Sequence, residues 1–199
     1  MKPVALIFLS IAAALAADKD NTRFAPGPAS SYKGAQTLDK ITIAAVPFVT
    51  EEQVKSAFGK VNPNKYGVLP VLVVIENGTG KALRLDLMTE YIDAEKQHVP
   101  ALSIEDVKNT NFAPKAPRMP GMNPLPFPLP SRGKKGPLNV WEIEGRAFAA
   151  KLLPPSESAS GFFYFYSDHT PGSQLYLTGI KEAATGKDYF YFEVPVEKQ

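Results

Sequence analysis

The stretch YGVLPVLVVIENGTGKALRLDLM, from Tyr66 to Met88, decides the predicted fold of this chain. Residues 69–76 are largely apolar on both faces of an alternating pattern, which is typical of a central strand. The pair Asn77-Gly78 tolerates the positive φ of a tight turn. After it, the leucines of residues 83–87 alternate with Arg and Asp, as in a half-buried strand. The stretch therefore predicts a central β-hairpin.

Asn77 also begins the triplet Asn-Gly-Thr, which matches the acceptor pattern for N-glycosylation. A tight turn explains the Asn-Gly pair better, and the modification would require a eukaryotic source. We interpret the triplet as a turn, and the sequence leaves the use of the acceptor open.

Composition favours one globular domain and disfavours several kinds of site. The chain has 199 residues, 44% of them apolar and 21% charged, and its 19 prolines favour loops and edges over long helices. A net charge of +2, from 22 basic and 20 acidic side chains, is too small for a nucleic-acid partner. The absence of cysteine excludes disulfides, thiolate nucleophiles and cysteine-ligated metals.

The first residues have the pattern of an export signal. Lys2 precedes an apolar run, and Ala14-Leu15-Ala16 places small residues where a signal peptidase cleaves. The alternative is an uncleaved anchor, but the run is shorter than the roughly 20 residues that span a bilayer. We predict a signal peptide over 1–16, no membrane span after cleavage, and a periplasmic or extracellular protein. The polar residues 17–40 are expected to form an extended leader.

A single β-sandwich domain is predicted over residues 41–196. Within it, residues 41–46 have the pattern of a buried strand, and Thr50 with Gln53 forms a predicted capping box for a short helix that stops at Gly59. Ser103 predicts a second, single-turn helix. Residues 139–153 fit either a helix face or alternating strands, and we favour two short strands or one strand with a bulge.

Proline dominates residues 113–137, so this segment is predicted to be a long, extended loop inserted in the domain. Its PxxP spacings also fit a ligand for an aromatic groove. A stiff surface loop is the interpretation we favour, because the domains that read such motifs are mainly intracellular.

The C-terminal half reads as aromatic strands separated by turns. Pro154-Pro155 and the serines after it predict a crossing between two sheets, followed by an aromatic strand at 162–166. In the last strand we expect Phe190, Phe192 and Val194 to share one face. The whole pattern resembles an immunoglobulin-like bacterial extracellular module, in which a valine-rich strand ending in Asn leads a hairpin and an aromatic strand follows a Pro/Ser corner. It predicts a mainly β, antiparallel, immunoglobulin-like sandwich with one or two short helices.

Tyrosines supply the candidate binding residues, because Tyr offers a rigid surface with both apolar and polar parts. Five of them could share one outward face: Tyr164, Tyr166, Tyr176, Tyr189 and Tyr191. We interpret the protein as a non-enzymatic module that contacts an envelope protein or a glycan through this face, with no cofactor, metal or catalytic residue.

Histidine supplies the alternative, a secreted hydrolase or metal-dependent enzyme. Asp168-His169 is a neighbouring acid and histidine pair, and His98 lies near Asp93 and Glu95 in sequence. Neighbouring strand residues point to opposite faces, so Asp168 and His169 are poorly placed to act as a catalytic pair. We therefore favour a surface turn there.

Overall fold

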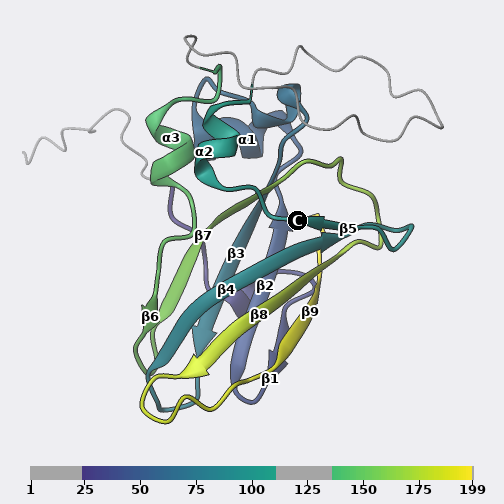
Figure 1. The fold of residues 1–199 in the computed structure, drawn as a ribbon. Helices are drawn as coiled ribbons and strands as arrows, with labels where there is room; N and C mark the ends of the chain where they lie inside the picture. The colour runs from purple at the N-terminus through teal and green to yellow at the C-terminus, as the bar shows by residue number, and fades with distance from the viewer. Residues whose placement is uncertain (1–23, 111–135, 199) are drawn as a thin grey trace, which may run out of the picture.

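The computed structural model describes residues 24–110 and 136–198, which form a mainly β structure with two antiparallel sheets (Figure 1). In the first sheet each strand pairs antiparallel with its neighbours, in the order β1 (Gln36–Leu38), β2 (Ile41–Pro47), β3 (Leu69–Asn77), β7 (Ser158–Phe165). A valine-rich strand, β3, is thus central, because β2 and β7 pair with its two edges.

The second sheet is also antiparallel, and its order is β5 (His98–Pro100), β4 (Leu83–Ile92), β8 (Gln174–Glu182), β9 (Tyr191–Pro195), with β6 (Leu152–Leu153) paired beside β5 on β4. The two long strands β4 and β8 form its centre. The arrangement is that of a β-sandwich.

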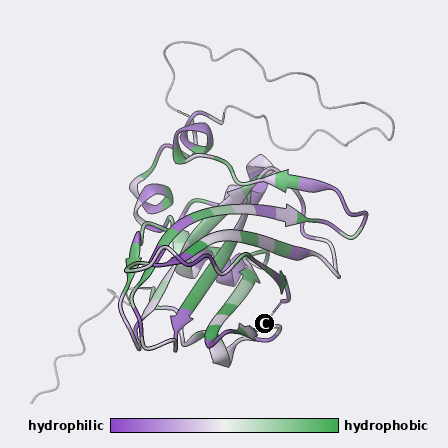
Figure 2. Cartoon of the chain, turned by 60° about the horizontal axis from the view of Figure 1, so that its bottom comes forward, coloured by the Kyte–Doolittle hydropathy of each residue, from purple (hydrophilic) through white to green (hydrophobic). Residues whose placement is uncertain are grey.

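The main core lies between the two sheets. One face of β3 contributes Val71, Val73 and Ile75, which have no exposed surface, and Leu83 and Leu85 of β4 meet them from the second sheet. In Figure 2 the hydrophobic colour runs along the strands, whereas the connecting segments are more polar. Burial of these β-branched and leucine side chains is the main favourable term in folding.

A second core covers the outer face of the first sheet. Three short helices of the described residues lie near one end of the sandwich (Figure 1): α1 (Glu51–Phe58), α2 (Ile104–Lys108) and α3 (Trp141–Gly145). Each supplies apolar side chains to a cluster with Phe162 and Tyr164 of β7. The short 3-10 helices η1 (Ala29–Ser31) and η2 (Pro63–Tyr66) complete the described helices. Because both faces of the first sheet are covered, β3 is apolar on both sides.

The predicted helix at residues 51–58 is confirmed. The Thr50 side chain accepts a hydrogen bond from the Gln53 backbone N–H at 3.2 Å, and the Gln53 side chain accepts one from the Thr50 N–H at 3.2 Å. Gly59 ends the helix as expected. The single turn that begins after Ser103 is confirmed as α2, with the Asp106 N–H donating to the Ser103 hydroxyl.

The predicted central hairpin is wrong. β3 and β4 follow one another in sequence but lie in different sheets, so residues 78–82 cross from one layer to the other. Asn77, only 2% exposed, fills this crossing: its amide donates to the carbonyls of Lys81, Leu153 and Pro154. A polar turn after a strand does not show whether the next strand pairs with the first strand in one sheet or packs over it in another. These contacts support the turn interpretation of Asn77, because a glycan on its amide nitrogen would displace them.

The predicted crossing at Pro154-Pro155 is confirmed. β6 before it pairs with β4 in the second sheet, and β7 after it pairs with β3 in the first. Phe162 and Phe165 of β7 enter the two different cores, so this strand is aromatic on both faces, as the sequence indicates.

Two other expectations differ from the structure. Residues 141–145 form α3 instead of a strand: only Ile143 is fully buried, whereas Trp141 is 68% exposed, so the alternating pattern reflects one buried residue on a single helical turn. Residues 24–40 contain β1 and the fully buried Ala29, so this part of the expected leader packs on the domain. The predicted signal peptide and nearly all of the proline-rich segment lie outside the described residues.

Candidate functional site

A β-bulge shapes the outer face of the second sheet. Leu85 pairs with Ile180 and Met88 with Thr178, so Asp86 and Leu87 of β4 together oppose Gly179 of β8. Gly179 has φ +88°, and a Cβ there would collide with the Asp86 carbonyl oxygen. Bulges bend a strand and redirect its side chains. Here the alternation changes on β8 at Gly179, whereas Asp86 and Met88 keep the outward positions of β4.

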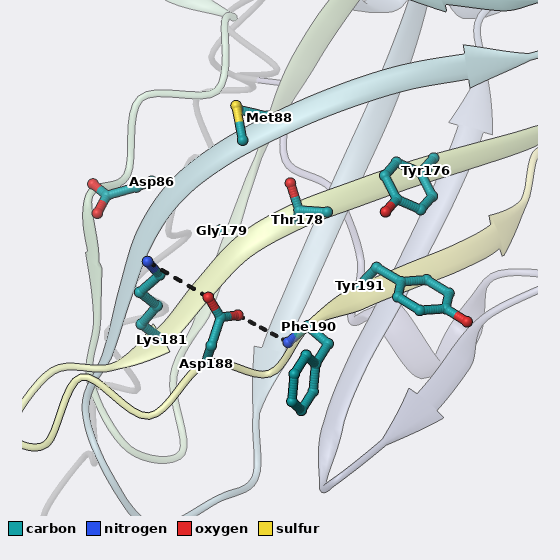
Figure 3. Close-up of a pocket in the computed structure, with 9 residues that line it drawn as sticks. All are labelled: Asp86, Met88, Tyr176, Thr178, Gly179, Lys181, Asp188, Phe190 and Tyr191. Carbon is teal, nitrogen blue, oxygen red and sulfur yellow. Dashed lines mark hydrogen bonds and ion pairs between the residues drawn. The ribbon is translucent and has the colours of Figure 1, made fainter.

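An open depression of about 600 Å³ lies over this bulge. Its lining residues come from β4, β8 and the segment that leads into β9, and Figure 3 shows them together: Asp86, Met88, Tyr176, Thr178, Gly179, Lys181, Asp188, Phe190 and Tyr191. Large hydrophobic side chains are freely accessible here, with exposed fractions of 70% for Met88, 78% for Phe190 and 52% for Tyr191.

Phe190 is held outward by its backbone. Its φ of +60° lies in the left-handed region, which is costly for a bulky residue. The Asp188 carboxylate accepts a hydrogen bond from the Phe190 N–H at 2.8 Å and so holds this turn. The turn reverses the expected alternation, because Tyr189 is buried at 7% exposure while Phe190 faces solvent. The prediction that Phe190 shares the face of Phe192 and Val194 is therefore wrong.

Of the five candidate tyrosines, the structure brings two together on this face. Tyr176 of β8 and Tyr191 of β9 stack with their ring centroids 5.5 Å apart and their planes at 25°. Cross-strand aromatic pairs of this kind form a firm, flat surface.

The other three candidates lie elsewhere. Tyr164 is 1% exposed in the helix-covered core, where its hydroxyl donates to the Ile143 carbonyl and burial raises its pKa. Tyr189 is buried in the main core, and Tyr166 lies at the end of β7, beside Gly67. A single face for all five is wrong, because β7 belongs to the first sheet and Tyr189 precedes the reversal at Phe190.

Charges in the depression are paired. The Lys181 amine lies 3.5 Å from the Asp188 carboxylate, and the Arg84 Nε atom, beside the depression, lies 2.8 Å from the Asp86 carboxylate. The two carboxylates and the two cations cancel. Glu90 and Glu193 lie on either side of Tyr176 on the same face, which thus combines exposed aromatic rings with polar groups and has no excess of positive charge.

The two histidines make separate contacts, His169 in the turn before β8 and His98 on β5. The His169 Nδ1 atom lies 3.2 Å from the Tyr91 hydroxyl, which donates to Ser173, and partial burial lowers the pKa of His169. His98 of β5 pairs with Glu90 of β4 at 2.7 Å, and both side chains are exposed. In the part of the chain that the structure describes, no three histidine or acidic side chains are placed to hold a metal ion. These contacts explain His169 as part of the turn before β8.

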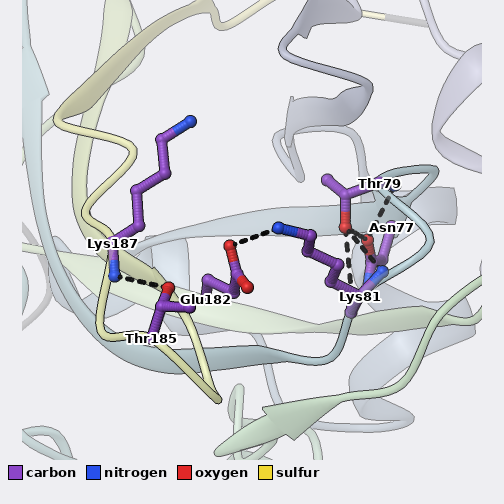
Figure 4. A network of polar contacts seen from close by, with 6 residues as sticks. All are labelled: Asn77, Thr79, Lys81, Glu182, Thr185 and Lys187. Carbon is purple, nitrogen blue, oxygen red and sulfur yellow. Dashed lines mark hydrogen bonds and ion pairs between the residues drawn. The ribbon is translucent and has the colours of Figure 1, made fainter.

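A second polar cluster closes the far end of the sandwich (Figure 4). The Lys81 amine donates to the Glu182 carboxylate at 2.9 Å, and Glu182 has a side-chain exposure of only 6%. This hydrogen bond lowers the pKa of Glu182 and raises the pKa of Lys81. The cluster joins the β3–β4 crossing to the end of β8, so we assign it a structural role.

Sequence reasoning missed Met88, Phe190 and the paired charges of the depression. Met88 continues the outward positions of Arg84 and Asp86, but alternation alone does not mark an exposed methionine as a binding residue, and Phe190 itself has a positive φ that breaks the alternation. Gly179 in the middle of an alternating strand was the available signal, because glycine inside a strand often marks a bulge.

Among the helices of residues 24–110 and 136–198, none is long enough and apolar enough to cross a bilayer. Comparison with models of known protein families and with curated proteins gives no match.

Proposed function

We propose that this protein is an exported, non-enzymatic binding module of the cell envelope, and that it binds its partner with the outer face of the second sheet. The observation that carries the proposal is Phe190. Its ring is 78% exposed, and its left-handed backbone costs about 1–2 kcal/mol with no burial to offset it. Backbone strain of this kind concentrates at functional sites.

The residues around Phe190 also favour this face as the binding surface. Met88 and the stacked pair of Tyr176 and Tyr191 extend the accessible surface around it. Aromatic residues and methionine are enriched where proteins bind partners. Rigid side chains lose little conformational entropy when they are covered.

An immunoglobulin-like fold is part of the proposal, and the strand order supports it. The order β2-β3-β7 in one sheet and β5-β4-β8-β9 in the other, with crossings at β3–β4 and β6–β7, is expected of a sandwich of this class. Such domains commonly present a sheet face or end loops to a partner. The proline-rich loop of residues 113–137 remains a second predicted surface.

Export rests on the sequence pattern of residues 1–16, and the cysteine-free composition is compatible with it. The direct test is fractionation of the source cells with an antibody to the protein. We expect the mature chain, without residues 1–16, in the periplasmic or extracellular fraction. Recovery of the uncleaved chain in the cytoplasm would contradict export.

The binding face is tested by retention on the envelope fraction of the source cells. We expect the purified mature chain to be retained, and Phe190→Ala and Tyr191→Ala to lose most of this retention, because each removes an exposed ring that lines the depression. Trp141→Ala is the matched control, because it removes an exposed ring from α3, which packs on the other sheet. Equal retention of all three variants would contradict the proposed face.

A further inference from the structure

The nature of the ligand follows from how polar and apolar groups are mixed in the depression over the bulge. Three of its nine lining residues are charged: Asp86, Lys181 and Asp188. Figure 3 shows the Lys181–Asp188 pair beside Phe190, among the residues that line the depression. The charged groups lie on one side of the depression and the rings of Tyr176, Phe190 and Tyr191 on the other.

A dry protein interface fits this pattern poorly. The centre of a protein–protein interface is depleted of charged residues. Covering the Lys181–Asp188 pair with apolar side chains would remove both ions from water, and that desolvation can exceed the attraction between them. A ligand that brings its own hydroxyl groups avoids this cost, because it replaces the water that the ions lose.

The aromatic rings of the depression can contact the apolar face of such a hydroxyl-bearing ligand. A sugar ring has one face of C–H groups and an edge of hydroxyls, and the electron-rich face of Phe190 or Tyr191 attracts the weakly positive C–H groups. The hydroxyl edge can then donate to Asp86 and Asp188 and accept from Lys181 or the Thr178 hydroxyl.

The charge balance selects among sugars. Asp86 is paired with Arg84 and Asp188 with Lys181, and Glu90 and Glu193 flank Tyr176 on the neighbouring strands, so the site offers no excess positive charge to hold an acidic ligand. From these observations, and resting on the proposed function of this face, we infer that the ligand is a neutral oligosaccharide or polysaccharide that stacks on Phe190 and Tyr191.

Affinity electrophoresis of the mature chain in gels that contain a soluble polysaccharide tests the inference. The neutral probes are laminarin, hydroxyethylcellulose, galactomannan and dextran, and alginate is the acidic probe. We expect at least one neutral probe to retard the protein, with a dissociation constant that added salt leaves unchanged, because no net charge is neutralised. Phe190→Ala and Tyr191→Ala should each weaken this binding by about tenfold or more, and Trp141→Ala should not.

Three results would overturn the inference: no retardation by any neutral probe, retardation by alginate alone that salt abolishes, or equal retardation of all the variants. Protease treatment of the envelope fraction separates this failure from that of the proposed function. If retention requires Phe190 and Tyr191 but disappears after proteolysis of the fraction, the ligand is a protein, and only the carbohydrate inference fails. If retention never depends on these residues, the proposed function fails as well.

Discussion

The outer faces of the two sheets differ in what covers them. On the first sheet, Leu72 and Val74 of β3 and Phe162 of β7 are buried under α1, α2 and α3. On the second sheet, Met88 and Tyr191 stand in solvent. Strand sequences reflect the difference, because β3 is apolar on both sides and β4 alternates. An exposed aromatic residue on the second sheet is therefore free of the packing role that a similar residue has on the first.

The largest expected effect is a difference in stability between two phenylalanine-to-alanine variants, one on each sheet. Phe162 contacts the rings of Phe24, Phe48, Phe58 and Tyr164, and its replacement by Ala should lower the free energy of unfolding by about 3–5 kcal/mol. Phe190→Ala, on the uncovered outer face of the second sheet, should change the free energy of unfolding by no more than about 0.5 kcal/mol. Denaturant unfolding of both variants measures the difference. Similar losses would mean that Phe190 also has a packing role.

Gly179 tests how much the close backbone approach at the bulge of the second sheet limits the residue at this position. Gly179→Ala places a methyl group against the Asp86 carbonyl at a positive φ, so we expect a loss of about 2–4 kcal/mol in the free energy of unfolding. Gly172→Ala is the matched control, because Gly172 has φ +81° and nothing within 4 Å of the added Cβ. The control should lose only about 1 kcal/mol. Equal losses in the two variants would show that the close approach at the bulge adds nothing.

The smallest expected effect concerns the Lys81–Glu182 pair. The pKa of Glu182 in the folded protein lies below its ordinary value of 4.5, so the pair stabilises fully above pH 4.5, and this contribution is lost as the pH falls through the lowered pKa. Lys81→Met should therefore be less stable than the parent at neutral pH, and the gap should narrow in acid. Unfolding midpoints measured across this range test the prediction, with Lys151→Met as an exposed-lysine control. A gap that stays constant with pH would show that the pair is not its cause.

Local signals in the sequence predicted much of the fold. Thr50 and Gln53 specify their helix by direct hydrogen bonds, and Pro154-Pro155 interrupts pairing where the chain changes sheets. The β3–β4 connection was not predictable in the same way, because Asn77 is satisfied by Leu153 and Pro154, which lie far away in sequence. The pairing of β3 is decided by distant strands.

The candidate site was predictable only in part. Tyr176 and Tyr191 were found because they occupy outward positions of regular strands. Phe190 was missed because a left-handed residue shifts the alternation by one position. Met88 keeps the regular alternation of β4, but an outward position alone does not mark it as a binding residue. Alternation predicts faces only where the backbone stays regular.

Asn77-Gly78 has a consequence for the chemical lifetime of the protein. Asparagine followed by glycine deamidates readily when the glycine nitrogen attacks the side-chain amide carbon, expels ammonia and leaves an aspartate or isoaspartate after hydrolysis. In the folded chain the Gly78 N–H donates to the Lys40 carbonyl at 2.8 Å, and the Asn77 amide donates to three carbonyl groups, so neither partner can reach the geometry of attack. Once the chain unfolds, this protection ends. On refolding, a carboxylate at position 77 would face three carbonyl oxygens. Long exposure to denaturant or heat is therefore expected to damage the protein irreversibly at Asn77.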